Sequence, residues 1–193
     1  DAISSAALQA RAYIDRRGAN PEDWALVSIK NHKNAELNPY AQLPIDLTVE
    51  QVMASRPLAE PLKLLDCSPI SDGASAVILA GEDRISESKQ KPVWLKGVGY
   101  AAELHYLGDR DLSEPQALTE AAKQAYKMAG VRNPQEQIDF LEVYDAFSYM
   151  EPLWLEGLGI CDKGKGGELI RNGVTEMTGR QPVNVSGGVL SAH

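Results

Sequence analysis

The feature that most constrains the fold is an alternation of short apolar runs and helix-like segments in the second half of the sequence. Strands that alternate with helices are typical of α/β layers around a largely buried sheet. We therefore predict one α/β unit over residues 93–193. Its predicted strands are residues 93–99, 138–143 and 182–185, and its predicted helices are residues 115–129 and 149–158.

Helical patterns dominate the first half. Apolar residues recur at helical spacing over residues 3–17, and Gly18 is placed to end that helix. A second helix is expected to begin with Asn20 as its N-cap and Pro21 at its first position. Thr48 is the expected cap of a short helix that reaches Ser55.

Less regular segments separate these helices. The Asn-rich residues 31–42 predict a loop or the end of a helix. The continuous apolar run at 76–80 predicts a strand buried on both faces. Polar residues 81–92 mark the most probable domain boundary. In the next apolar run, Gly97 and Gly99 would allow another backbone to approach closely.

Composition restricts the classes of function. The chain has 193 residues, of which 44% are hydrophobic, as in ordinary globular proteins. Its net charge of −8 disfavours broad nucleic-acid binding, which needs a basic face. An anionic ligand stays possible, because a few local cations and helix N-termini can hold phosphates. Cys67 and Cys161 lie far apart, so we expect no metal site and a reducing, cytoplasmic setting.

Two polar constellations follow strand-like runs. One is the Tyr144–Phe147 stretch, and the other runs from Asn184 through Gly187 and Gly188 to His193. Ligands gather at such strand ends in open α/β sheets, and paired glycines can aim N–H groups at an oxyanion. Each constellation also has a purely structural interpretation. The glycine pair could form a plain turn, and Tyr144 could be a packing residue. We expect the Tyr144 hydroxyl and the His193 ring to face a common cavity.

Four segments in order resemble the thiolase superfamily, in the branch related to sterol carrier protein thiolase and to archaeal and bacterial acetyl-CoA acetyltransferase-like proteins. They read N-H-K-N-A-E-L-N-P-Y-A-Q, L-L-D-C-S-P-I-S-D-G-A-S-A-V, V-Y-D-A-F-S and P-V-N-V-S-G-G-V-L-S-A-H. The third stands where this branch has His-Asp-Ala-Phe, and the last stands where the family has a Gly-His-Pro motif. Tyr144 and Ala192 depart from those motifs.

The resemblance implies a five-layered α-β-α-β-α thiolase fold, present in part. Residues 1–91 would be the end of the N-terminal thiolase half, and residues 92–193 most of the C-terminal half. Both ends of the sequence fall inside structural patterns, so we expect an internal piece of a longer protein. The resemblance places the nucleophilic cysteine before Asp1 and a Cys-Gly motif after His193. Cys67 and Cys161 match neither position.

The resemblance also assigns roles to individual residues. His193 is expected to activate the nucleophilic thiol, and Tyr144 to donate to the oxyanion or act as an acid or base. Asp145 is expected to brace its loop by hydrogen bonds. The residues expected to bind the substrate or coenzyme A are Ser68, Ala146, Phe147, Gly187 and Gly188.

The implied function is a thiolase-type acyltransferase that forms or cleaves a 3-oxoacyl-CoA by Claisen chemistry, with coenzyme A as a substrate and no covalently bound cofactor. One alternative is a thiolase-fold retro-aldolase on a CoA thioester that uses Tyr144. Another is a non-catalytic thiolase-like scaffold subunit. The expected partners are a second copy of the chain, as a homodimer or a dimer of dimers, and a small zinc-ribbon/OB-fold protein.

Overall fold

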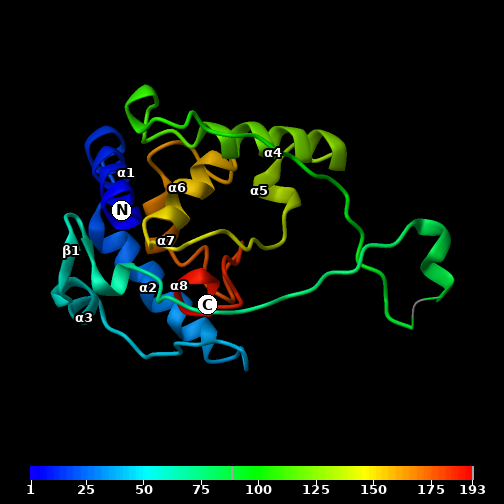
Figure 1. The fold of residues 1–193 in the computed structure, drawn as a ribbon, viewed down its shortest axis with the longest axis horizontal. Coiled ribbons are helices and arrows are strands. Elements are labelled where there is room, and N and C mark those ends of the chain that lie inside the picture. Colours follow the sequence, from blue (N-terminus) through cyan, green and yellow to red (C-terminus); the bar gives the residue numbers. More distant parts are fainter. Residues whose placement is uncertain (88, 193) are drawn as a thin grey trace.

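The computed structural model describes residues 1–87 and 89–192 and is mainly helical (Figure 1). The α-helices are α1 (Ala2–Arg17), α2 (Pro21–Ala35), α3 (Val49–Ala54), α4 (Gln116–Ala129), α5 (Pro134–Gln137), α6 (Met150–Gly157), α7 (Gly166–Arg171) and α8 (Gly188–Ala192). The remaining elements are strands β1 (Pro57–Ala59) and β2 (Leu62–Lys63) and 3-10 helices η1 (Leu64–Asp66), η2 (Glu82–Glu87) and η3 (Leu107–Asp109). Strands β1 and β2 pair in an antiparallel hairpin. No helix in the described ranges has the length and hydropathy that a membrane span requires.

The ends of the first three helices confirm the predicted caps. Gly18 closes α1 in the left-handed conformation, with φ 66°. The Asn20 side chain accepts a hydrogen bond from the N–H of Glu22 at the start of α2. Thr48 and Gln51 form a capping box at the start of α3. These local signals act within a few residues, so the sequence is sufficient to specify them.

Helix α4 matches the helix predicted over residues 115–129, and Gly130 ends it with φ 74°. The close approach predicted at Gly97 and Gly99 is also confirmed, and its partner is the backbone of α4. A side chain at Gly97 would collide with the carbonyl of Ala125, and one at Gly99 with the carbonyl of Ala121. The two glycines therefore allow residues 97–100 to lie directly against α4 (Figure 1).

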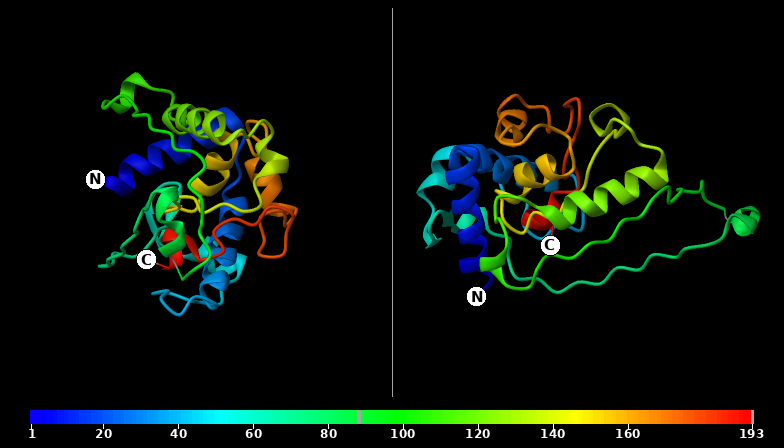
Figure 2. Two further views of the ribbon diagram at one scale, coloured as in Figure 1. Left: turned by 90° about the vertical axis from the view of Figure 1, so that its right-hand side faces the viewer. Right: turned by 90° about the horizontal axis from the view of Figure 1, so that it is seen from above.

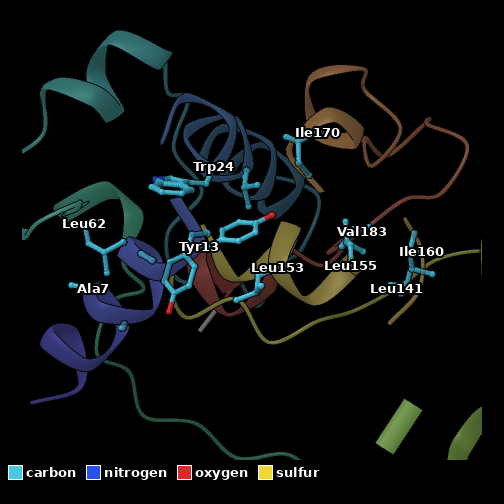
Figure 3. Close-up of a cluster of buried hydrophobic side chains, with 14 residues drawn as sticks. Ala7, Tyr13, Trp24, Leu62, Leu141, Leu153, Leu155, Ile160, Ile170 and Val183 are labelled. Carbon is cyan, nitrogen blue, oxygen red and sulfur yellow. The ribbon is translucent and has the colours of Figure 1, made fainter. Parts of the chain in front are cut away.

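The core lies between α1, α2 and α6, where aromatic and aliphatic side chains interlock (Figure 3). Trp24 of α2 meets Tyr149 edge to face, with 6.1 Å between the ring centres. Tyr13 of α1 is also buried, and its hydroxyl donates a 2.5 Å hydrogen bond to Glu156 of α6. Helix α2 contacts α3, α7 and α8 as well, which makes it the central element of the compact part.

Two of the predicted strands are only partly realised. Residues 138–143 and 182–183 are non-helical and meet in one parallel bridge between Leu141 and Val183, whereas Asn184 has a left-handed φ of 53° and Val185 lies in a turn. The N–H of Leu141 donates to the carbonyl of Pro182, and the N–H of Asn184 donates to that of Leu141, both at 2.9 Å. A parallel strand needs neighbours over several residues, and one bridge does not supply them.

The strands predicted at 76–80 and 93–99 are wrong for this structure. Residues 70–87 and 89–96, here called the arm, extend away from the compact part (Figures 1 and 2). Val77 and Ile78 are 83% and 94% exposed. No backbone hydrogen bond joins residues 70–80 to another described residue. The apolar run thus lacks the neighbouring strand that its burial requires.

The Asn-rich segment is the end of a helix followed by a loop, as predicted, because α2 continues to Ala35 before the loop begins. Asn31, His32 and Asn34 are all buried in this last part of the helix. The side chains of Asn31 and Asn34 hydrogen bond to Asp145 and Asn184, far away in the sequence, so tertiary contacts outweigh the usual preference of Asn for turns. The predicted boundary at 81–92 falls within the arm, around η2.

Candidate functional site

The two predicted constellations meet through Asp145. We call residues 144–147 the turn and residues 184–190 the segment that faces it. The Asp145 side chain is fully buried, and its Oδ1 accepts hydrogen bonds from the N–H groups of Val189 at 2.6 Å and Leu190 at 3.4 Å. Its Oδ2 accepts a 2.6 Å hydrogen bond from the side-chain amide of Asn31 in α2. Asp145 therefore braces its loop, as predicted, and the brace reaches the glycine-rich segment.

Burial changes the acid–base behaviour of this carboxyl. Loss of hydration raises the pKa of Asp145 to about 7, and the nearby carboxylate of Glu151 acts in the same direction. The hydrogen bonds from Val189 and Asn31 and the charge of Lys30 oppose the rise without cancelling it. Asp145 thus takes up a proton much more readily than an exposed aspartate does.

Gly187 and Gly188 occupy positions that only glycine fills without strain. Their φ angles are 103° and 63°, in the region that disfavours side chains. A Cβ at Gly187 would lie 2.8 Å from the Cβ of Ala35, and one at Gly188 would collide with the Asp145 carboxylate. The glycines allow the segment to pack tightly on both α2 and the turn.

Tyr144 lies at the surface end of the turn. Its side chain is 64% exposed and lines an apolar hollow of about 380 Å³ together with Leu118 of α4 and Trp154 and Leu158 after the turn. The carbonyl of Tyr144 accepts a 2.6 Å hydrogen bond from Nε1 of Trp154, which fixes the backbone while leaving the phenol accessible. The hydroxyl is therefore free to reach a ligand in that hollow.

A second hollow, of about 840 Å³, lies beside the segment and is lined by Asn38, Ser186 and Ala192 among others. Asn38 donates a 2.9 Å hydrogen bond to the carbonyl of Ser186. Tyr144 and Ala192 line different hollows. His193 lies outside the described residues, so the common cavity for Tyr144 and His193 stays a prediction.

Ser68, Ala146 and Phe147 lie together on the inner side of the turn. The N–H of Ser68 donates a 2.9 Å hydrogen bond to the carbonyl of Ala146. Phe147 pairs with Cys67 through an antiparallel bridge, and its ring stacks on that of Tyr149 with 6.4 Å between centres. Phe147 packs against the core, and binding roles for these residues stay predictions.

The two cysteines are poor nucleophiles. Burial raises the pKa of each thiol, Cys67 and Cys161, to about 12. Cys67 Sγ also donates to the carbonyl of Lys63 at 3.3 Å. Among the described residues, no cluster of three or more His, Cys, Asp or Glu side chains could hold a metal ion.

Sequence reasoning missed a charged pair beneath the turn. Lys30 of α2 lies 3.1 Å from Glu151 of α6, and both side chains are almost fully buried. The available signal was the placement of Lys30, Asn31 and Asn34 at positions i, i+1 and i+4, which puts polar groups on one face of a helix that also carries Trp24. When the rest of a helix packs in the core, polar residues on one of its faces indicate that they have polar partners inside the protein.

Comparison with known proteins places this arrangement in a family. Residues 99–193 match the family described as thiolase C-terminal domain-like. An acetyl-CoA acetyltransferase of Methanothermobacter thermautotrophicus is 46% identical over 95% of this chain and 48% of its own length. Sterol carrier protein 2 of Oryctolagus cuniculus is 34% identical over 94% of this chain and 34% of its own length. The chain spans about half of the archaeal relative.

A solved structure titled "Ltp2-ChsH2(DUF35) aldolase" is similar, with a TM-score of 0.84 and 30% identity over 97% of this chain and 50% of that chain. The chain belongs to the thiolase superfamily, and residues 99–193 are its C-terminal domain-like part. The thiolase fold predicted from the sequence is confirmed for the part that this chain covers.

Proposed function

We propose that this chain is part of a thiolase-type acyltransferase that forms or cleaves the carbon–carbon bond beside a coenzyme A thioester. The observation that carries the proposal is the Asp145 brace, which holds the turn bearing Tyr144 against Gly187 and Gly188. The 46% identity with the archaeal acetyl-CoA acetyltransferase supports the same chemistry.

Each proposed role follows from the demands of that reaction. A thioester oxygen gains negative charge as the bond forms or breaks, so it needs fixed hydrogen-bond donors. We assign this role to the Tyr144 hydroxyl and to the N–H of Gly188, because the N–H groups of Gly187 and Val189 already donate to Asn184 and Asp145. His193 would remove the proton from a nucleophilic thiol. Burial disfavours the thiolates of Cys67 and Cys161, so we assign neither of them as the nucleophile.

The pantetheine arm would lie along the inner side of the turn. Ser68, Ala146 and Phe147 gather there, joined by the backbone hydrogen bond from Ser68 to Ala146. The apolar hollow beside Tyr144 has room for an acyl group. We further propose a protein partner, since the similar solved structure is titled as an assembly with a DUF35 protein.

The test is turnover of an acyl-CoA by the Tyr144→Phe variant of the complete protein. Removing one oxyanion donor typically lowers turnover by on the order of a hundredfold, while the retained ring keeps the packing. Tyr106→Phe is the matched control, because Tyr106 is 70% exposed and lies outside the site. Wild-type turnover in Tyr144→Phe would remove Tyr144 from the proposed site.

A retro-aldol carbon–carbon lyase is the second candidate, and the similarity to the solved aldolase favours it. There Tyr144 would act as the acid or base, so Tyr144→Phe should nearly abolish turnover. Stoichiometry separates the two reactions. Thiolytic cleavage consumes one free coenzyme A for each bond broken, whereas retro-aldol cleavage consumes none and releases a carbonyl product.

A further inference from the structure

Beneath the turn lies a group of buried polar side chains to which the proposed chemistry gives no direct role. Each is at most 2% exposed, although they include a lysine and two carboxyl groups. They come from α2, from the turn, from α6 and from the segment. The group consists of Lys30, Asn31, Asp145, Glu151 and Asn184.

Lys30 is at the centre of the group. Its Nζ donates 2.6 Å hydrogen bonds to the carbonyl of Val183 and to Oδ1 of Asn31. It also lies 3.1 Å from Oε1 of Glu151. A buried ammonium group is unfavourable unless it is paired and hydrogen-bonded, and here both conditions are met. One side chain of α2 thus holds the residue immediately before the segment.

Glu151 continues the connections on the other side of Lys30. Its Oε2 accepts hydrogen bonds from the side-chain amides of Asn184 at 2.9 Å and Asn31 at 3.1 Å. The Asn31 amide also donates to Oδ2 of Asp145, and Oδ1 of Asp145 accepts a hydrogen bond from the N–H of Val189. An unbroken set of contacts therefore leads from Lys30 and Glu151 to both sides of the proposed site.

Asn184 shows that the segment is held in an unusual conformation. Its φ is 53°, and no other described non-glycine residue has a positive φ. The side-chain amide donates to Glu151, while Oδ1 accepts from the N–H of Val143 at 2.8 Å. Its carbonyl accepts from the amide of Asn34 at 3.0 Å. A non-glycine residue keeps a positive φ only where surrounding contacts hold it, and these hydrogen bonds hold Asn184.

We propose that Lys30 and Glu151 are positioning residues, and that their buried ion pair fixes the turn against the segment so that donors from both meet one substrate. The catalytic part of this inference rests on the proposed function. A displacement of about 1 Å in such a site can lower turnover by on the order of a hundredfold. Neither side chain would touch the substrate.

The central experiment replaces the pair by apolar residues, as Lys30→Met together with Glu151→Leu in the complete protein. Removing both charges avoids an unpaired buried charge, and apolar replacements of buried ion pairs often preserve the fold. We expect a folded variant whose turnover falls by on the order of a hundredfold while KM changes far less. Wild-type turnover in this folded double variant would overturn the proposal.

The control removes a matched ion pair from the surface. In α4, Nζ of Lys123 lies 2.6 Å from Oε1 of Glu120, and the two side chains are 66% and 58% exposed. The variant Lys123→Met with Glu120→Leu should keep wild-type turnover. Loss of turnover in both double variants would attribute the effect to charge removal in general and reject the positioning role.

Hydrogen exchange of the Val189 amide tests the brace without any assay of activity, because that amide donates to Asp145. In the Lys30→Met, Glu151→Leu variant we expect exchange at least about tenfold faster than in the surface control. Unchanged exchange would overturn the proposal whatever the activity. If the wild type catalyses neither reaction but Val189 exchange still accelerates, the proposed function fails and the brace stands.

Glu151→Asp covers the case in which the double variant does not fold. It keeps the charge that pairs with Lys30 but is shorter by one methylene, so the contacts with Asn184 and Asn31 cannot all be kept. Positioning predicts a folded protein with turnover reduced at least tenfold. Wild-type turnover and wild-type Val189 exchange in Glu151→Asp would overturn the proposal.

Discussion

Val183 and Val77 are the same residue type in extended backbone, yet Val183 is fully buried and Val77 is 83% exposed. Val183 pairs with Leu141, and its carbonyl accepts a hydrogen bond from Lys30. Val77 lies in the arm, where the stretch 70–80 has no backbone hydrogen bond to any described residue. The contrast shows that an apolar run is buried only where a neighbour is present to satisfy its backbone.

The largest expected difference between the two regions is in backbone hydrogen exchange. The amides of Asn184 and Val189 are hydrogen-bonded, whereas those of Val77 and Ile78 are not bonded to any described residue. Exchange measured by NMR on the 193-residue chain should therefore be at least ~1,000-fold slower in the first pair. Similar protection in both pairs would mean that the arm is folded.

Glycine substitutions provide the next comparison. At Gly188 the φ is 63° and a Cβ would meet the Asp145 carboxylate, so Gly188→Ala should lower the free energy of unfolding by about 3 kcal/mol or more. At Gly73, in the arm, a Cβ meets nothing within 4 Å, so Gly73→Ala should change the free energy of unfolding by less than about 0.5 kcal/mol. Denaturant unfolding measures both, and equal losses would contradict the structure.

The last comparison concerns the dependence of stability on pH. Because the pKa of Asp145 is raised to about 7, the folded state binds a proton that the unfolded state releases near pH 4. This contribution to stability is complete below about pH 4 and is lost as the pH rises through about 7. Within that window the slope is at most about 1.4 kcal/mol per pH unit.

Asp145→Asn should remove that part of the pH dependence, as measured by the difference from wild type in denaturant unfolding between about pH 4 and 7. The matched control is Asp72→Asn in the arm, where the side chain is exposed, and its pH profile should follow that of the wild type. If the wild type instead became more stable than Asp145→Asn as the pH rises, the sign would be opposite and the raised pKa of Asp145 would be refuted.

The elements that could be predicted from sequence are those specified by nearby residues. Gly18, Asn20 and Thr48 mark helix ends through contacts within a few positions, and α4 and α6 follow from apolar spacing. The predictions of strands at 76–80 and 93–99 were wrong, since a strand depends on a neighbour that its own residues do not specify.

For the candidate site, sequence reasoning located the turn, the glycine pair and the brace of Asp145. It did not find Lys30 and Glu151, because the atoms that satisfy them come from elements far away in the sequence. A buried lysine and an exposed lysine look alike in a sequence, and only the fold decides which one is present.

The central position of α2 has a consequence for the order of folding during synthesis. Lys30 and Val183 are 153 residues apart, and Asn34 and Asn184 are 150 apart. Ribosomes add roughly 5–20 residues per second, so α2 emerges roughly 8 to 30 seconds before these distant partners exist. Until then its ammonium and amide groups stay in water, and the compact part closes only as a late, long-range step.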